Sequence, residues 1–283
     1  MNTKAYFSLQ RIQAGIRYLI MSVGALLTLS PLWILLVNSF KPQTRIVDNP
    51  IVPPEQFDFQ YISNALTQLQ FLKSIGFTML ITTLAVILIV LLSSMAAWIM
   101  VRSKLKIAGF IFMAFVSAML IPFQAIMYPL IQFFDALGLK NLGGLILMYG
   151  GFGLSMSIFL YHGFVKSVPL EVEEAAFIDG AHIVQMFFLI VMPLLKSITV
   201  TVIIINAMWI WNDYLLPFLV IGNSENKTLV LSLYFAQILA GQYGNPWQLI
   251  FPAVLLTITP IVVVFLFLQR FIVKGISAGA VKG

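Results

Sequence analysis

Long apolar stretches separated by short polar segments run along the whole chain. A helix needs about 20 mostly apolar residues to cross the hydrocarbon core of a bilayer. Because the apolar residues form continuous runs and do not alternate with polar ones, they predict helices. We predict an all-α membrane protein with one transmembrane domain, residues 1–283, and six spans at about residues 14–38, 74–101, 107–134, 143–165, 198–221 and 249–269.

The composition excludes a soluble protein. The chain is 60% hydrophobic and 9% charged, with a mean hydropathy of +1.00, whereas soluble domains carry about 25% charged residues. It has no cysteine, which excludes disulfides, thiol catalysis and thiolate metal sites. The only histidines, His162 and His182, argue against a histidine metal site. The net charge of +6 is typical of cations that flank membrane spans, and we expect no nucleic-acid partner.

The distribution of Lys and Arg predicts the orientation, because cytoplasmic segments of membrane proteins carry an excess of them. With the N-terminus inside, eleven of the sixteen lie in inner segments: Lys4, Arg11, Arg17, Arg102, Lys104, Lys106, Lys166, Lys196, Arg270, Lys274 and Lys282. The other five lie in outer segments: Lys41, Arg45, Lys73, Lys140 and Lys227. We therefore expect both termini in the cytoplasm and the segments 41–73 and 222–248 outside. Within the first of these, residues 41–60 are predicted to be an exposed loop and residues 59–71 a short helix at the interface.

The inner loop between the fourth and fifth spans, residues 166–197, has an acidic first half. Pro169 suits the first turn of a helix, because its missing N–H costs nothing there. Glu171, Glu173 and Glu174 follow in the first turns, where negative charge complements the helix dipole. Gly180 then offers a turn. The acidic half is therefore predicted to be a short helix that faces the cytosol.

The second half of this loop, Ile183 to Leu195, is apolar but too short to span a membrane. Four of its residues would share one helical face: Ile183, Phe187, Ile190 and Leu194. We predict a helix–turn–helix against the inner face of the membrane. A partner that grips the first helix could move the fourth and fifth spans together. The residues alone leave open a solvated hairpin without a partner.

The stretch EEAAFIDGAHIVQMFFLIVMPLL closely resembles the E-A-A loop of the permease subunits of bacterial ABC importers. The matching positions are Glu174, Ala175, Ala176, Asp179, Gly180, Ala181, Phe187, Ile190 and Pro193. One departure is Lys196, where many members have a second proline. Within that superfamily the chain resembles the carbohydrate-uptake branch, and most of all its six-span maltose-type subunit. Three further stretches extend the likeness to essentially the whole chain: residues 30–42, 209–218 and 269–283.

The resemblance implies that this loop is a coupling helix that docks on a cytosolic ATPase. The implied coupling residues are Glu173, Glu174, Ala175, Ala176, Asp179, Gly180, Ala181, Phe187 and Pro193. Glu174 would meet a basic residue of the ATPase, and Gly180 would permit the bend between the two helices. The glycine-rich C-terminal tail, residues 270–283, would lie in the cytoplasm between ATPase subunits; the alternative is a disordered basic end.

The resemblance also implies the assembly. The partners would be a second homologous permease, two ATPase subunits, an extracytoplasmic solute-binding protein, the transported sugar and the lipid of the bacterial inner membrane. The chain has no G-x-x-x-x-G-K-[ST] sequence to hold phosphates. We therefore expect ATP and Mg²⁺ on the partner ATPase, no cofactor on this chain, and no enzyme activity of its own.

Polar residues within the predicted spans are candidates for the solute path, because such residues are costly in a membrane and often functional. An aspartate near a helix centre costs about 2.5–3.5 kcal/mol on insertion scales. Amides and carboxylates can bond sugar hydroxyls, and indole faces can pack on pyranose rings. The candidates are Asn206, Trp209, Asn212, Asp213, Tyr214 and Gln124. The residues leave open that Asn212 and Asp213 instead hold helices together or bond to backbone freed near Pro217. We also expect Pro122 and Pro129 to break the third span.

Three other functions are alternatives to a sugar permease. An ABC permease for a polyol or glycerol phosphate would share these features. An ion-coupled secondary transporter predicts inverted repeats and ionisable pairs within the membrane, whereas this sequence shows one intramembrane acid and no visible repeat. A membrane-embedded enzyme finds little support, because the sequence has no H-E-x-x-H and no nucleophile beside a plausible base.

Overall fold

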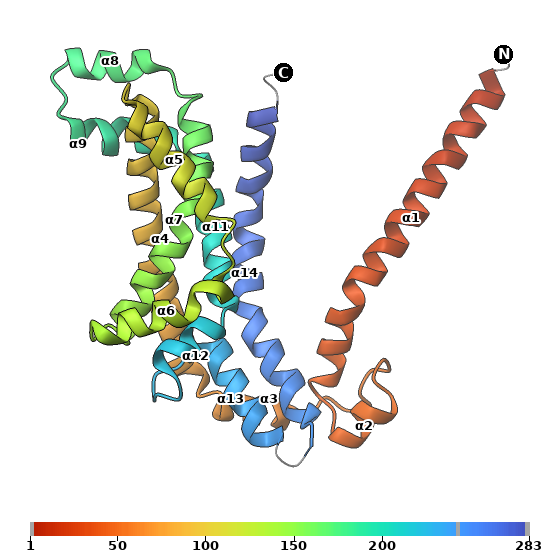
Figure 1. Ribbon diagram of the computed structural model, residues 1–283. Helices are drawn as coiled ribbons and strands as arrows, with labels where there is room; N and C mark the ends of the chain where they lie inside the picture. Colours follow the sequence, from red (N-terminus) through yellow and green to blue (C-terminus); the bar gives the residue numbers. More distant parts are fainter. Residues whose placement is uncertain (1–2, 242–243, 281–283) are drawn as a thin grey trace. The chain divides into compact units, whose positions relative to one another are not determined.

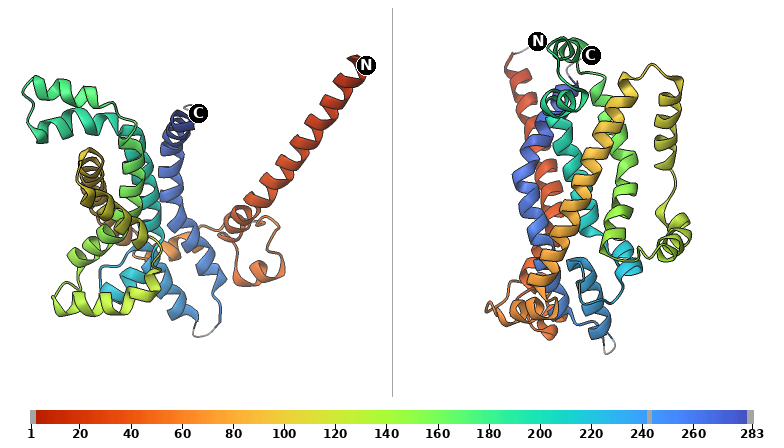
Figure 2. Two further views of the ribbon diagram at one scale, coloured as in Figure 1. Left: turned by 45° about the horizontal axis from the view of Figure 1, so that its top comes forward. Right: turned by 90° about the vertical axis from the view of Figure 1, so that its left-hand side faces the viewer.

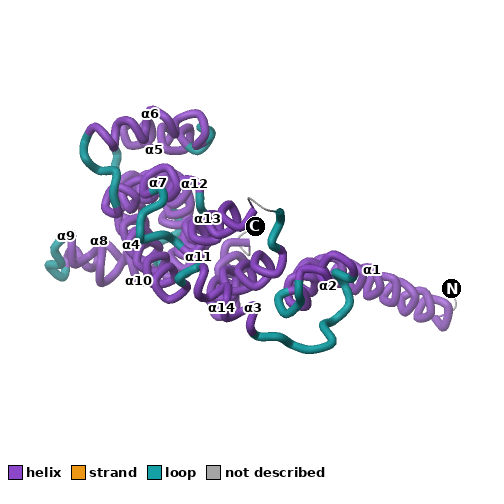
Figure 3. The backbone as a smooth tube through the Cα atoms, turned by 90° about the horizontal axis from the view of Figure 1, so that it is seen from below, coloured by secondary structure: helices purple, strands orange, loops and turns teal. Residues whose placement is uncertain are grey.

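All regular elements in the described part of the chain are helices joined by loops (Figure 3). The computed structural model describes residues 3–241 and 244–280, with side chains from residue 13 to 238, at 241 and from 244 to 267. The chain divides into two compact units. The first contains residues 1–69 and 236–258, and the second contains residues 70–235 and 259–283. The prediction of an all-α protein is confirmed.

Among the residues that the structure describes, four helices are long and apolar enough to cross a membrane, and two bent helix pairs raise the number to as many as six. The four candidate spans are Gln13–Asn38, Phe71–Arg102, Leu142–Val165 and Trp247–Phe267. They correspond to the first, second, fourth and sixth predicted spans. The third predicted span is one of the bent pairs, so it consists of two helices and not of one continuous helix.

The first unit holds the long helix α1 (Thr3–Asn38), two short helices, α2 (Gln43–Asp48) and α3 (Gln60–Gln68), and residues 236–258. Figure 1 shows α1 as one long rod. Only 11% of the most apolar 18-residue stretch of α1 is buried within the chain. A helix that is apolar and uncovered on most sides suits a surrounding of lipid or other helices.

The segment after α1, residues 39–69, is mostly exposed between residues 41 and 60, as expected, and the helix expected within residues 59–71 is α3. The segment is nevertheless folded. Asn38 Nδ2 donates to the carbonyl of Pro50 at 2.7 Å, and Lys41 Nζ donates to Asn38 Oδ1 at 3.1 Å and to the carbonyl of Asn49 at 2.9 Å. These bonds bury Lys41, and the burial lowers its pKa. Gln43 and Gln248 each donate a backbone N–H to the side chain of the other. The composition of this segment predicted a loop. In the structure, hydrogen bonds from polar side chains to backbone carbonyls hold the segment in a fixed fold.

The second unit is built on α4 (Phe71–Arg102) and α7 (Leu142–Val165), which pack along each other. Their contact is apolar and fully buried at Ile81, Ile89, Leu145 and Tyr149. Glycine permits the close approach, since a Cβ on Gly150 would lie 2.7 Å from Leu88 Cδ2. Helix α11 (Lys196–Asn212) packs against both α4 and α7.

The third predicted span is broken. Helices α5 (Lys106–Ala118) and α6 (Phe123–Ala136) meet at an angle of 104°. Pro122 directly precedes α6, as its N-cap residue. It favours the break because a proline disfavours helical geometry in the residue before it. The expectation for Pro129 was wrong: it lies inside α6, and the helix continues through it.

The fifth predicted span is also interrupted. Helix α11 ends at Asn212, and α12 (Leu215–Ile221) begins after Asp213 and Tyr214. Helix α13 (Leu229–Gly241) follows, and α14 (Trp247–Ala280) continues into the predicted C-terminal tail. Residues 270–280 of that tail are helical, and residues 281–283 lie outside the described residues. Figure 2 shows these helices from two further sides.

Candidate functional site: a helical hairpin and a membrane cavity

The loop 166–197 folds as a helical hairpin at one end of the second unit (Figure 1). Its first limb is α8 (Leu170–Ile178), preceded by Pro169 as the N-cap residue. At its end, Gly180 N donates to the carbonyl of Phe177 and Ala181 N to the carbonyl of Ala176, both at 3.0 Å. This pair of bonds is a Schellman motif, which needs a left-handed residue. Gly180 supplies it, with φ +84°.

The second limb contains α9 (Ile183–Gln185), a π-helical segment, Met186–Val191, and α10 (Met192–Leu194). His182 closes the turn: its Nδ1 accepts from Val184 N, and its own N–H donates to Gln185 Oε1 at 3.1 Å. The limb buries Met186, Phe187, Val191 and Leu195, and leaves Ile183 and Leu194 exposed. That Ile183 and Leu194 face the membrane stays a prediction, and the sequence did not predict that part of the limb is π-helical.

Helix α8 has two different faces. Glu173 and Ala176, three residues apart, are buried. The rest of the helix surface exposes Glu174, Ala175, Phe177 and Ile178, with Phe177 73% and Ile178 84% exposed. Asp179 and Pro193 are exposed as well, Ala181 is half-buried, and Phe187 is buried. The predicted coupling residues are therefore split between a surface and an internal contact.

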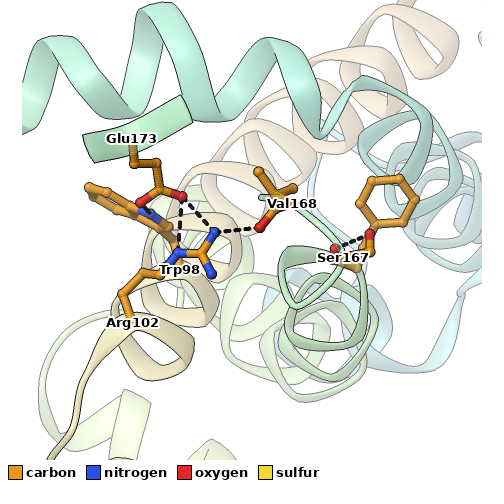
Figure 4. Close-up of polar contacts among 6 residues, drawn as sticks. Trp98, Arg102, Ser167, Val168 and Glu173 are labelled. Carbon is orange, nitrogen blue, oxygen red and sulfur yellow. Dashed lines mark hydrogen bonds and ion pairs between the residues drawn. The ribbon is translucent and has the colours of Figure 1, made fainter. Parts of the chain in front are cut away.

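The Glu173 carboxylate is held by the C-terminal end of α4 (Figure 4). Arg102 donates to Glu173 Oε1 from Nη2 at 2.7 Å and from Nε at 3.0 Å, and Trp98 Nε1 donates to Oε2 at 2.9 Å. Arg102 Nη2 also donates to the carbonyl of Val168 at 2.9 Å. We define Trp98, Arg102 and Glu173 as the inner latch. Sequence reasoning missed its α4 members. A signal was present, since Trp98 and Arg102 are one turn apart at the end of a helix.

The predicted solute-path residues do not form one cluster. Asn206 and Trp209 line a cavity of about 700 Å³ in the second unit, together with apolar residues such as Phe123, Met148 and Phe152. Asn206 is buried, and its Nδ2 donates to Ser157 Oγ at 3.0 Å and to the carbonyl of Val202 at 2.8 Å. Trp209 is 43% exposed. Of the six candidates, these two are brought to the cavity by the fold.

The other candidates have different surroundings. Tyr149 donates its hydroxyl to Asp213 Oδ2 at 3.0 Å, and Leu215 N donates to Asp213 Oδ1 at 2.9 Å. Asp213 thus caps α12 and joins it to α7. Asn212 donates to the carbonyl of Met208 in its own helix, and Tyr214 stacks on Tyr234 with ring centres 5.1 Å apart. Gln124 is exposed on α6. The contacts of Asn212 and Asp213 are those of residues that organise helices.

A family model agrees with this arrangement. Residues 89–278 match the binding-protein-dependent transport system inner membrane component family. The chain belongs to this family. The match contains the C-terminal end of α4, the hairpin, α11 and most of α14. The resemblance drawn from the E-A-A stretch is therefore confirmed, and the chain is a multi-pass membrane component of a binding-protein-dependent transport system.

Relatives match over nearly the whole chain. A probable starch degradation products transport system permease protein of Thermoanaerobacterium thermosulfurigenes is 38% identical, over 94% of this chain and 97% of the relative. A multiple sugar-binding transport system permease protein of Streptococcus mutans is 33% identical, over 94% and 96%. A melibiose/raffinose/stachyose import permease protein of Bacillus subtilis is 34% identical, over 89% and 91%.

The fold is also that of a solved importer. A chain from the crystal structure of a bacterial ABC transporter that imports the acidic polysaccharide alginate superposes with a TM-score of 0.78. The superposition covers 92% of this chain and 96% of that chain, at 20% sequence identity. At that identity the likeness shows the fold alone.

Proposed function

We propose that this chain is a permease subunit of an ATP-driven importer that moves a sugar or oligosaccharide into the cell. The observation that carries the proposal is the near full-length similarity to three permeases named for starch products, multiple sugars and melibiose, raffinose or stachyose. The sugars in these names differ, so the similarity supports a carbohydrate class without selecting one compound. Asn206 and Trp209 offer an amide and an indole at the membrane cavity, which suits hydroxyls and sugar rings.

The exposed face of α8 is the proposed docking surface for the cytosolic ATPase. It combines the Glu174 carboxylate with the apolar side chains of Phe177 and Ile178. Large apolar groups exposed together commonly mark an interaction site. Gly180 fixes the turn behind this surface, so the hairpin offers a defined shape to a partner. With this surface in the cytoplasm, both termini lie in the cytoplasm too.

The proposed assembly contains this chain, a second homologous permease, two ATPase subunits and an extracytoplasmic solute-binding protein in an inner membrane. ATP and Mg²⁺ bind the ATPase subunits in this scheme, and the E-A-A hairpin passes their closure to the permease. The Lys and Arg excess in the inner segments supports this orientation. The exposed apolar surface of α1 suits lipid and a neighbouring permease.

Uptake of defined solutes tests the function. Cells that produce the complete importer, and cells that lack only this chain, are supplied with radiolabelled maltotriose, raffinose, sorbitol or glycerol 3-phosphate. We expect uptake of at least one of the two sugars to depend on this chain. Chain-dependent uptake of sorbitol or glycerol 3-phosphate, with no sugar transported, would contradict the carbohydrate assignment.

A further inference from the structure

The Glu173 carboxylate points away from the proposed docking surface. Only 6% of its side chain is exposed, and three donor atoms of α4 fill its two oxygens. Its neighbour Glu174 has the same chemistry one position along α8 but lies on the exposed face. An acid that is already bonded and buried within its own chain is poorly placed to bind a partner protein. The two glutamates therefore have different roles.

Arg102 joins three pieces of the chain. Its guanidinium binds Glu173 on α8 through two nitrogens and the carbonyl of Val168 in the segment before α8 through one of them. Charge-assisted contacts through two nitrogens fix orientation as well as distance. The inner end of α4 is thereby tied both to the start of the hairpin and to its first helix.

Trp98 connects the second limb to the same point. Its indole N–H donates to Glu173, while its ring lies 5.4 Å from the ring of Phe187 in the π-helical segment. Phe187 is 1% exposed. The last two turns of α4 thus contact both limbs of the hairpin, one by a hydrogen bond and the other by ring packing.

The covalent connections of the hairpin run elsewhere. Its first limb follows α7 and its second limb precedes α11, whereas Arg102 lies 71 residues before Glu173. A force on the hairpin therefore reaches α7 and α11 through the backbone, but reaches the inner end of α4 through side chains. Such packed, hydrogen-bonded contacts are what carry energetic coupling between distant sites.

We propose that the inner latch makes the hairpin and the inner end of α4 move as one body when the ATPase closes. Trp98, Arg102 and Glu173 are positioning residues: they bind neither ATP nor the solute, and they act through α4. This inference rests on the proposed function, because the ATPase supplies the movement. It adds that the hairpin moves α4 directly, in addition to α7 and α11.

Spin labels measure this rigidity. The chain has no cysteine, so Ile99→Cys on α4 and Val172→Cys on α8, outside the proposed docking surface, create two label sites; both side chains are exposed, by 57% and 41%. Double electron–electron resonance gives the distance distribution between them. It is recorded for the isolated chain and for the complete importer, without nucleotide and with ATP and vanadate.

With the inner latch intact, we expect one narrow distribution that is the same in all states. Glu173→Gln should broaden it in the isolated chain and shift it when vanadate traps the importer. Glu174→Gln is the matched control, with the same substitution on the exposed face, and should leave it narrow. Trp98→Phe keeps the ring beside Phe187 but removes the N–H, and should broaden it less than Glu173→Gln.

Two results would overturn the proposal: a distribution that shifts with nucleotide in the intact latch, or an unchanged distribution in both Glu173→Gln and Trp98→Phe. If Glu173→Gln fails to fold, Trp98→Phe alone decides between the narrow and broadened results. The proposed function fails separately, when no ATPase subunit co-purifies with the unsubstituted chain. The isolated-chain distributions still decide the rigidity of the inner latch in that event.

Discussion

Two carboxylates in different regions of the second unit, Glu173 and Asp213, have different surroundings, and Glu173 is buried whereas Asp213 is half-buried. At the hairpin, Glu173 is balanced by the Arg102 cation and the Trp98 N–H. Between α11 and α12, Asp213 is held by neutral donors, the Tyr149 hydroxyl and the Leu215 N–H. A buried ion pair loses much when one member is removed, whereas a hydrogen-bonded acid can keep part of its network as an amide. The comparison distinguishes Glu173, which forms an ion pair between two helices, from Asp213, which accepts hydrogen bonds from neutral donors at the start of a helix.

Removal of the cation should have the largest effect. Arg102→Ala leaves the Glu173 carboxylate buried without its counterion, and breaking a buried pair in this way costs about 3–5 kcal/mol. The free energy of unfolding of the purified chain in detergent measures the loss. Arg45→Ala is the control, because Arg45 pairs with Glu55 while their side chains are 58% and 82% exposed. It should cost about 0–1 kcal/mol. Equal losses at both arginines would contradict the burial argument.

Substitutions at Asp213 should have a smaller effect and distinguish charge from hydrogen bonding. Asp213→Ala removes the acceptor for both Tyr149 and Leu215 and should cost about 1–3 kcal/mol of unfolding free energy. Asp213→Asn keeps one acceptor oxygen and should cost less than Asp213→Ala. If the asparagine is as damaging as Arg102→Ala, then Asp213 needs its charge, and the contrast between the two regions is wrong.

A substitution at the turn of the hairpin should change the free energy of unfolding through backbone strain alone. A Cβ at Gly180 would contact nothing within 4 Å, but the residue has φ +84°. Gly180→Ala should therefore cost about 1–2 kcal/mol, the penalty of a left-handed conformation for an L-residue. The same unfolding measurement applies. Gly151→Ala is a useful control, since Gly151 is helical and a Cβ there also has open space. A loss no larger than that of the control would exclude strain at the turn.

The smallest effect on stability is expected at Glu174. Glu174→Gln changes an exposed side chain and should stay within about 0.5 kcal/mol. It should nevertheless reduce the amount of ATPase subunit that co-purifies with the importer, because it removes charge from the proposed docking surface. Retention of the ATPase at the level of the unsubstituted importer would contradict that surface.

Much of the hairpin could be predicted from the sequence, because its signals are local. Pro169 before α8, the acids of the first turn and Gly180 at the turn act on their immediate neighbours. The split between Glu173 and Glu174 could not be predicted from these signals. It depends on where α4 ends and on the direction of the Arg102 side chain, and the sequence reading used Arg102 only as evidence of orientation.

The helix interruptions show a similar limit. Pro122 indicated the break before α6, because proline restricts the residue before it. Pro129 carried the same local signal, yet α6 continues through it. The break at Asp213 also had a local signal, because Pro217 cannot donate a hydrogen bond to the carbonyl four residues before it. The bond of Asp213 with Tyr149, 64 residues away, had no such signal. The π-helical segment of the second limb was not predicted either.

The side of the membrane on which the hairpin lies tests the account most directly. Ile178→Cys gives the cysteine-free chain one thiol on α8, and Val52→Cys, at a residue 56% exposed in the segment after α1, gives the outer control. A membrane-impermeant maleimide is applied to right-side-out and to inverted vesicles. We expect residue 178 to react only in inverted vesicles and to be protected when the ATPase subunits are bound, while residue 52 reacts only in right-side-out vesicles. Reaction of residue 178 in sealed right-side-out vesicles would contradict the account.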